Sequence, residues 1–152
     1  MPVVERTAIV PYTCEEMFNL VNGFDQYPEF LPWCSLGELH ESSDKGLVAS
    51  LGIKKGIISD QFTTKNTNFP PRTITMELLD GPFEFLQGSW AFDPLGNQTL
   101  GEEKGCKIHL YMHFSFKIGL VNLLTKTLEN DMAKMVDAFI DRAEDVYGKR
   151  VL

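Results

Sequence analysis

Residues 106–117 read CKIHLYMHFSFK, and this stretch decides the fold class. Apolar side chains occupy every second position: Cys106, Ile108, Leu110, Met112, Phe114 and Phe116. More polar side chains fill the positions between them: Lys107, His109, Tyr111, His113, Ser115 and Lys117. Because successive side chains of a strand point to opposite faces of its sheet, this pattern predicts a strand with one face on a core and the other in water.

The segment after this strand changes to a helical period. Between residues 120 and 147 the apolar positions recur every three or four residues: Val121, Leu124, Leu128, Met132, Met135, Phe139, Ala143 and Val146. Such a stripe is typical of an amphipathic helix. We expect one long helix, about 40 Å in length at 1.5 Å per residue, with Gly148 as its C-terminal cap.

The part of the chain before residue 106 carries the two-residue period in short runs. From residue 33 to 92 apolar positions alternate with polar ones, and Gly, Pro, Asn and Asp separate the runs. Turn-forming residues stand at 55–56 and 80–82, and residues 93–105 are polar and glycine-rich. This arrangement predicts an antiparallel meander of about six strands, the last two joined by a long hairpin loop.

The N-terminal residues predict one more strand and two short helices. Residues 3–10 are rich in β-branched side chains and stop at Pro11. Thr13 and Glu16 then have the spacing of a capping box ahead of an apolar stripe, and residues 24–27 allow one further helical turn.

Together these elements predict an α+β fold, in which a curved antiparallel sheet of about seven strands faces a long C-terminal helix. A single helix is only about 10 Å thick, so a twisted sheet around it can leave an apolar cavity. The alternative is that the 11 phenylalanines fill this space, as they would in an ordinary core.

Composition limits the classes of function. The 152 residues include 14 Lys and Arg against 21 Asp and Glu, which gives a formal net charge of −7. That balance disfavours DNA as a partner, because a phosphate backbone is held by clustered basic side chains. No apolar run approaches the ~18 residues of a membrane-spanning helix and no signal-peptide pattern is present, so we expect a cytoplasmic protein. Cys14, Cys34 and Cys106 are expected to be free thiols.

Catalytic signatures are absent from the sequence, which contains neither a nucleophile elbow nor a phosphate-binding loop. His109 and His113 lie about 13 Å apart on the predicted strand, too far to share a metal ion. Asp60 has the strand parity of Phe62, so its carboxylate faces either the cavity or, at a bulge or edge, the solvent. We expect a binding protein that is not an enzyme and needs no cofactor or metal.

Residues 27–34, YPEFLPWC, place large apolar side chains between prolines. Exposing so much apolar surface is unfavourable, and two interpretations follow. The segment either caps the core or forms the mouth of a pocket, where its apolar rim would admit a ligand and make transient contact with a membrane surface.

This segment also carries a family resemblance. Together with RTAIVPY at 6–12, LDGPF at 79–83, GSWAF at 88–92 and MVDAF at 135–139, it resembles the START-like coenzyme-Q-binding and ribosome-association-toxin family. The resemblance extends over essentially the whole chain. It implies a helix-grip fold around a deep apolar cavity, with residues 1–152 as a single START-like ligand-binding domain.

The resemblance implies two different functions. Some members bind ubiquinone and support respiratory electron transfer, whereas similar bacterial members are toxins that bind the large ribosomal subunit and block subunit joining. We place first a carrier or chaperone of an isoprenoid lipid such as ubiquinone, which would work in the cytoplasm or at the inner membrane. Ribosome association is the alternative, and a polyketide cyclase activity lacks visible catalytic residues.

The candidate ligand-binding residues are the large apolar side chains predicted to face the cavity. They are Tyr27, Phe30, Leu31, Trp33, Phe62, Met76, Trp90, Leu110, Met112, Phe114, Leu124, Leu128 and Met132. Each buried CH₂ of a prenyl tail contributes about 0.8 kcal/mol, so such a ligand depends on apolar area more than on polar contacts.

Overall fold

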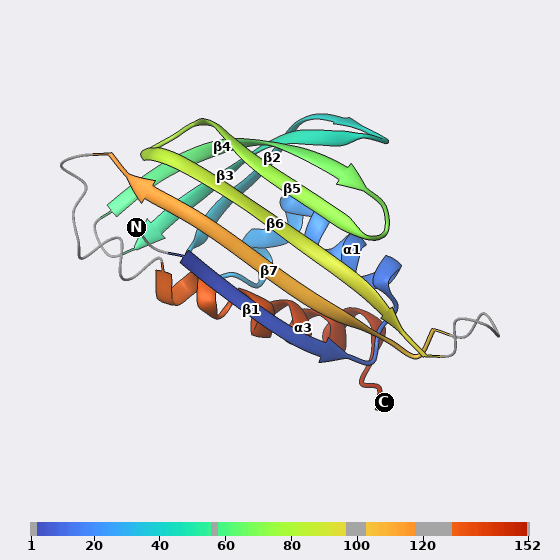
Figure 1. Cartoon of the computed structure of the whole chain (residues 1–152). Helices are drawn as coiled ribbons and strands as arrows, with labels where there is room; N and C mark the ends of the chain where they lie inside the picture. The colour runs from blue at the N-terminus through green and yellow to red at the C-terminus, as the bar shows by residue number, and fades with distance from the viewer. Residues whose placement is uncertain (1–2, 56–57, 97–102, 118–128, 152) are drawn as a thin grey trace.

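The structure is a computed structural model that describes residues 3–55, 58–96, 103–117 and 129–151. Its strands form one antiparallel sheet in the order β1-β7-β6-β5-β4-β3-β2 (Figure 1). The strands are β1 (Val3–Val10), β2 (Cys34–Ser43), β3 (Gly46–Lys55), β4 (Ile58–Phe69), β5 (Thr73–Asp80), β6 (Phe83–Leu95) and β7 (Gly105–Phe116). The predicted meander is confirmed, and β1 closes its far edge by pairing with β7.

Strand β7 has the predicted alternation. The side chains of Cys106, Ile108, Leu110, Met112, Phe114 and Phe116 are buried, and those between them are half-buried or exposed. Although it is the last of these strands in the sequence, β7 is an interior strand of the sheet, because β1 pairs with it along one side and β6 along the other. Because both edges of β7 are hydrogen-bonded, only its apolar face remains to be shielded from water. That face lies over the core.

Two short helices follow β1, as predicted. Helix α1 (Cys14–Asn22) begins with the expected capping box, in which the N–H of Glu16 donates to the Thr13 hydroxyl and the N–H of Thr13 to the Glu16 carboxylate. The 3₁₀ helix η1 (Phe24–Glu29) comes next. It contacts β2 and buries Phe24 and Tyr27.

The C-terminal helix has an interruption that periodicity does not predict. Residues 129–133 are helical, a turn follows at Lys134, and α3 (Met135–Tyr147) continues. At the turn, the Lys134 N–H lies 3.2 Å from the carbonyl oxygens of both Asn130 and Asp131, so its hydrogen bond is shared. Gly148 ends the helix with φ of 87°, a conformation that favours glycine, so the predicted cap is confirmed. The predicted start of the helix, at residues 120–128, lies outside the described residues.

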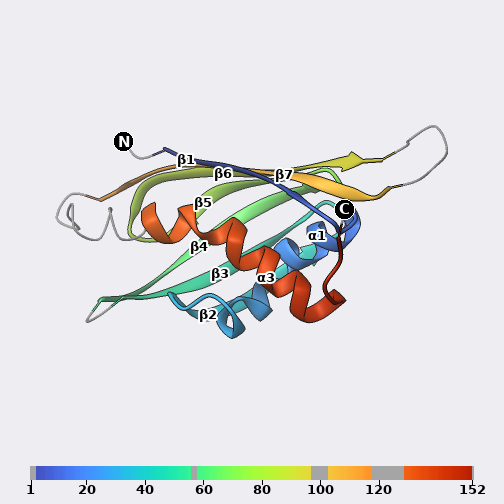
Figure 2. The ribbon, with the colours of Figure 1, turned by 90° about the horizontal axis from the view of Figure 1, so that it is seen from below.

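The elements form two layers. Helices α1 and α3 and the helix η1 lie against the same, concave face of the curved sheet (Figure 2). Among the described residues, no helix covers the outer face. The core therefore lies between the sheet and α3, where Trp90, Phe92 and Phe139 are almost completely buried.

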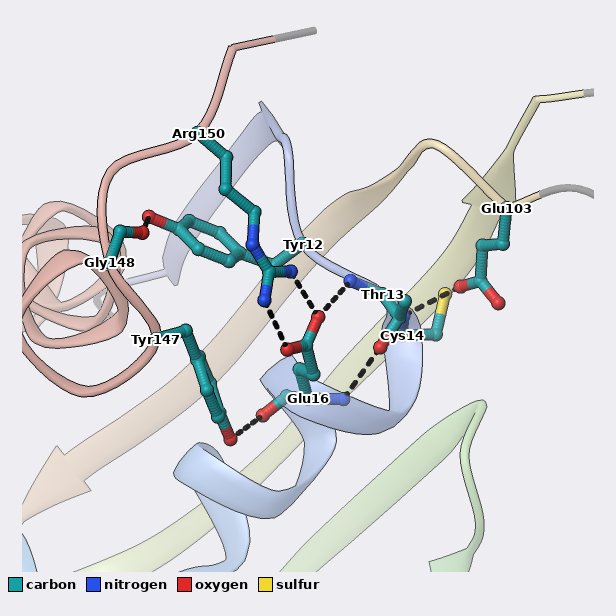
Figure 3. A network of polar contacts seen from close by, with 8 residues as sticks. All are labelled: Tyr12, Thr13, Cys14, Glu16, Glu103, Tyr147, Gly148 and Arg150. Carbon is teal, nitrogen blue, oxygen red and sulfur yellow. Dashed lines mark hydrogen bonds and ion pairs between the residues drawn. The ribbon is translucent and has the colours of Figure 1, made fainter.

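The residues after α3 return to the start of α1 and are held there by a polar network (Figure 3). The Arg150 guanidinium donates two hydrogen bonds to the Glu16 carboxylate, at 2.6 and 2.9 Å, and lies over the Tyr12 ring. The Tyr12 hydroxyl donates to the carbonyl of Gly148, and the Tyr147 hydroxyl donates to the carbonyl of Glu16. We call these five residues the C-terminal clamp.

The clamp predicts a pH dependence of stability. The Arg150 hydrogen bond holds the pKa of Glu16 below its ordinary value of 4.5. A carboxyl whose pKa is lowered by folding stabilises the protein above its unfolded-state pKa, and this contribution is lost as the pH falls through the folded-state pKa. We expect Glu16→Gln to be less stable than the wild type at pH 7, and the difference to shrink as the pH falls below 4.5, in urea unfolding followed across this range.

The control is Glu15→Gln, which removes a carboxylate from the same first helical turn, where Glu15 is exposed. Its loss should be smaller at pH 7, because it reports only the attraction of a carboxylate to the helix N-terminus. Equal losses in the two variants would show that the ion pair with Arg150 adds nothing.

Candidate functional site

The concave face of the sheet and the C-terminal helix enclose one small apolar cavity of about 30 Å³. Its lining comes from η1, from the segment between η1 and β2, from strands β3 to β7, and from the helical residues on both sides of Lys134. The lining residues are Phe24, Tyr27, Trp33, Leu51, Phe62, Thr64, Met76, Leu86, Trp90, Leu110, Met112, Met132 and Met135. Thr64 is the single hydroxyl-bearing aliphatic side chain among them.

Most of the predicted ligand-binding residues line this cavity. They are Tyr27, Trp33, Phe62, Met76, Trp90, Leu110, Met112 and Met132. Leu124 and Leu128 lie outside the described residues. Whether the cavity takes a ligand stays a prediction.

Three predicted residues lie elsewhere. Phe114 is buried, but it packs against Phe83 and Phe116, with ring centroids 6.0 and 5.9 Å away. Phe30 and Leu31 lie in the segment between η1 and β2, where Leu31 is buried in the core and Phe30 packs against the C-terminal helix. Strand parity identifies the inward face, but it does not say which inward side chains fill the core and which border a gap.

Residues that sequence reasoning missed complete the lining: Phe24, Leu51, Thr64, Leu86 and Met135. Leu51 and Leu86 could have been predicted, because both occupy inward positions of strands in which apolar and polar residues alternate. Met135 stands one helical turn from Met132 on the same face. Thr64 shares the strand parity of Phe62, but its residue type gave no signal, because a threonine fits either face of a strand.

The size of the cavity decides what it holds in this conformation. A space of about 30 Å³ suits one water molecule. Pockets for small organic ligands measure about 300–1,000 Å³. Among the described residues, which leave out the predicted start of the helix at 120–128, the deep cavity expected from the family resemblance is nearly closed, and a prenyl lipid requires side chains or α3 to move.

An aromatic cluster around Phe139 of α3 lies beside the cavity and includes two of its lining residues, Tyr27 and Trp90. The ring centroids of Tyr27, Phe30 and Trp90 lie 5.3, 5.1 and 5.3 Å from that of Phe139, each in an edge-to-face arrangement. Such pairs contribute about 0.5–1.5 kcal/mol each beyond their buried area. The Tyr27 hydroxyl also donates to the carbonyl of Val21, and burial raises the pKa of this hydroxyl.

Of the two interpretations of residues 27–34, the structure favours the core cap. Tyr27, Leu31 and Trp33 are at most 5% exposed, so they present no apolar rim to a membrane. At the surface the segment is held by Arg142, which lies 5.1 Å from the centre of the Phe30 ring and 3.4 Å from the Glu29 carboxylate.

One wall of the interior is polar. Thr64, Asn66 and Asn68 follow one another along the inner face of β4, and all three are buried. The Thr64 hydroxyl donates to the Asn66 side-chain oxygen at 2.9 Å, and the Asn68 amide donates to the Asn22 side-chain oxygen at 3.1 Å. The Nδ2 atom of Asn66 and the Oδ1 atom of Asn68 have no partner. Buried polar atoms are normally paired, so this wall offers water or a ligand a donor at Asn66, beside Thr64, and an acceptor further along the strand at Asn68.

The other candidate residues lie on the outside. Asp60 is exposed and its carboxylate accepts from the Gln61 N–H, so the solvent interpretation holds. His109 contacts Glu5 at 2.8 Å on the outer face of the sheet, and His113 packs against the Phe85 ring. In the ranges that the structure describes, no group of three His, Cys, Asp or Glu side chains is placed to hold a metal ion.

A contact between a serine and a histidine resembles part of a catalytic triad. His40 Nε2 lies 2.8 Å from the Ser50 hydroxyl, which in turn lies 2.6 Å from the Thr63 hydroxyl. Ser50 is only 1% exposed, so a substrate does not reach its oxygen. The nearest oxygen of Glu38 is 4.0 Å from His40 Nδ1, too long for a hydrogen bond that orients the ring.

The sequence profile of the family described as polyketide cyclase / dehydrase and lipid transport matches residues 10–140. A Vibrio cholerae protein named ribosome association toxin RatA is 41% identical over 150 residues, which cover 98% of this chain and 100% of that protein. A Pseudomonas aeruginosa protein of the same name is 42% identical over 146 residues, covering 95% and 97%. The mitochondrial coenzyme Q-binding protein COQ10 of Drosophila melanogaster is 26% identical over 147 residues, which cover 96% of this chain but 57% of that protein.

Solved structures share the fold. The Zhui aromatase/cyclase from Streptomyces sp. R1128 superposes with a TM-score of 0.78 at 18% identity, covering 94% of this chain and 93% of that one. A START superfamily protein from Mycobacterium smegmatis gives 0.76 at 19%, covering 95% and 98%. The predicted START-like helix-grip fold is confirmed. None of the helices in the described residues is both long and apolar enough to cross a membrane.

The core-cap interpretation predicts the effect of a charge at Leu31. Because this side chain is 2% exposed, Leu31→Asp should lower the free energy of unfolding by about 3 kcal/mol or more, through lost apolar burial and an unpaired buried carboxylate. The matched control is Leu39→Asp on β2, where the leucine is 48% exposed, with an expected loss of about 1 kcal/mol or less. Urea unfolding measures both, and similar losses would place Leu31 at a solvated mouth instead.

Proposed function

The chain belongs to the polyketide cyclase / dehydrase and lipid transport family, and from this premise we propose that it is a ribosome-associating protein that inhibits translation. The observation that carries the proposal is its 41% and 42% identity, over nearly the whole chain, to the two bacterial proteins named ribosome association toxin. The large ribosomal subunit is the proposed partner, and a block of subunit joining is the proposed effect. This order reverses the sequence-based expectation, which placed a ubiquinone carrier first.

The small size of the cavity that the described residues enclose supports the reversed order. A lipid carrier needs internal room, whereas a ribosome-binding protein needs only an exposed surface. The cavity of about 30 Å³ is roughly a tenth of what a small organic ligand occupies. The outer face of the sheet, which no described helix covers, is available to a large partner (Figure 2).

Charge limits the kind of contact with the ribosome. Lys65 of β4 and Lys107 of β7 are exposed, but Glu5 and Glu77 are exposed on the neighbouring strands. With a net charge of −7, the chain attracts RNA phosphates weakly. We therefore propose that ribosomal protein supplies most of the contact surface.

Sucrose gradients test the proposal. In cells that overproduce the protein, we expect free subunits to accumulate at the expense of whole ribosomes, and the protein to sediment with the large subunit. Overproduction of an unrelated protein of similar size controls for the load on translation. Unchanged profiles, with the protein remaining at the top of the gradient, would overturn the proposal.

The salt dependence of binding tests the kind of contact. Affinity for purified large subunits should fall only gently with salt, and the slope of log K against log[salt] should be no steeper than about −3. A steeper slope would mean that lysines and arginines neutralise several phosphates, and that RNA is the main surface contacted.

A second candidate function is the binding of an apolar molecule with a hydrogen-bonding head, such as ubiquinone. The specific observation in its favour is the cavity itself, where four methionines adjoin the polar wall at Thr64. Thioether side chains are flexible and adapt to irregular ligands, so this interior has the means to expand. The relative named coenzyme Q-binding protein supports the same ligand class.

Tryptophan fluorescence tests this candidate, because the two tryptophans of the chain, Trp33 and Trp90, both line the cavity. Titration with a short-chain ubiquinone should quench their emission. Thr64→Val should weaken binding about two- to tenfold, the equivalent of one hydrogen bond. Thr67→Val, at an exposed position of the same strand, should leave binding unchanged. Absence of saturable quenching would remove this candidate and leave ribosome association untouched.

Both candidates are binding functions, and we propose that the protein is not an enzyme. The aromatase/cyclase neighbour shares the fold at 18% identity, which gives no basis for transferring its activity. The proposed place of action is the cytoplasm, where ribosomes assemble.

A further inference from the structure

Two cysteines far apart in the sequence meet in the core. Cys14 is the first residue of α1, and Cys106 lies near the start of β7. Their sulfur atoms are 3.1 Å apart, and both residues are 0% exposed. The third cysteine, Cys34, is occupied elsewhere, since its thiol donates to the carbonyl of Leu36.

We propose that Cys14 and Cys106 form a reversible disulfide when the protein meets a peroxide. A disulfide has an S–S bond of about 2.05 Å, so the two sulfurs need to approach by only about 1 Å. In the first step, one cysteine sulfur attacks hydrogen peroxide, becomes a sulfenic acid and releases water. The second sulfur then attacks the sulfenic sulfur, the S–S bond forms and a second water leaves. Two thiols are thereby oxidised by two electrons, and one peroxide is reduced to two waters.

The backbone on both sides holds the two sulfurs together. The N–H of Cys14 donates to the Glu103 carboxylate at 2.7 Å, which ties the start of α1 to the residues just before β7 (Figure 3). Cys106 is fixed in the sheet, where it pairs with Val10 on one side and Pro94 on the other. These contacts therefore bring the two sulfurs together whenever α1 lies against the sheet.

Burial sets the rate of oxidation. It raises the pKa of both thiols, so little of the reactive thiolate is present at neutral pH, and neither sulfur is open to solvent. Peroxide consequently reaches the thiols only when α1 moves away from the sheet. The C-terminal clamp opposes this motion, because Arg150 holds Glu16 in the first turn of α1. Loosening the clamp should speed oxidation of the pair.

The disulfide would stabilise the fold. It closes a loop between residues 92 positions apart in the sequence, and a loop of this length strongly restricts the unfolded chain. It also fixes α1, whose Val21 carbonyl accepts the hydrogen bond of Tyr27 in the core cap. We infer that oxidation makes the domain harder to open.

The test treats the purified full chain with hydrogen peroxide, blocks the remaining thiols with an alkylating agent, and measures intact mass. We expect a loss of two hydrogen atoms, one alkylated thiol at Cys34, and a peptide that joins residues 14 and 106. The melting temperature should rise by roughly 5–10 °C and fall again with a reducing thiol. Cys34→Ser should retain the crosslink, and Cys106→Ser should lose it.

A variant of the C-terminal clamp distinguishes a disulfide that forms slowly from one that does not form at all. Arg150→Ala should form the same disulfide about two- to fivefold faster, the effect of losing one exposed ion pair. An unchanged rate would overturn the gating by the clamp. The proposal itself fails if all three thiols of this variant remain alkylatable after peroxide, or if the bond that forms includes Cys34.

Discussion

The packing of Phe139 against the inside of the sheet is the interaction on which the rest of this structure depends. Its ring contacts Trp90 of the sheet and both Tyr27 and Phe30 of the segment before β2. A curved sheet with one apolar face has to bury that face against other elements. Here α3 and the core cap at residues 27–34 cover it around Phe139, where the two meet. This contact joins α3 to the sheet and to the core cap.

Elements with a strict period were predictable from the sequence. The alternation in residues 106–117, the capping box at Thr13 and Glu16, and the cap at Gly148 all appear in the structure as predicted. Each is a local consequence of backbone geometry, so neighbouring residues suffice to reveal it. The shared hydrogen bond at Lys134 was not predictable, because it depends on how two helical segments meet the sheet together.

The candidate site was predictable only in part, for a physical reason. Periodicity gives the direction of a side chain but not the volume around it. Phe114 and Trp90 both point inward and both are fully buried, yet only Trp90 borders the cavity. For the same reason the sequence left open whether the core is hollow, and the described residues enclose only a small cavity.

We propose that this protein acts through the outer surface of its sheet while α3 and η1 stay packed against the inner face. Hydrogen–deuterium exchange of the amides of α3 and η1, compared between the free protein and its complex with large ribosomal subunits, tests this proposal. We expect these amides to exchange equally slowly in both states, and new protection to fall on the strands of the sheet. Faster exchange of α3 and η1 in the complex, or no complex at all, would contradict it.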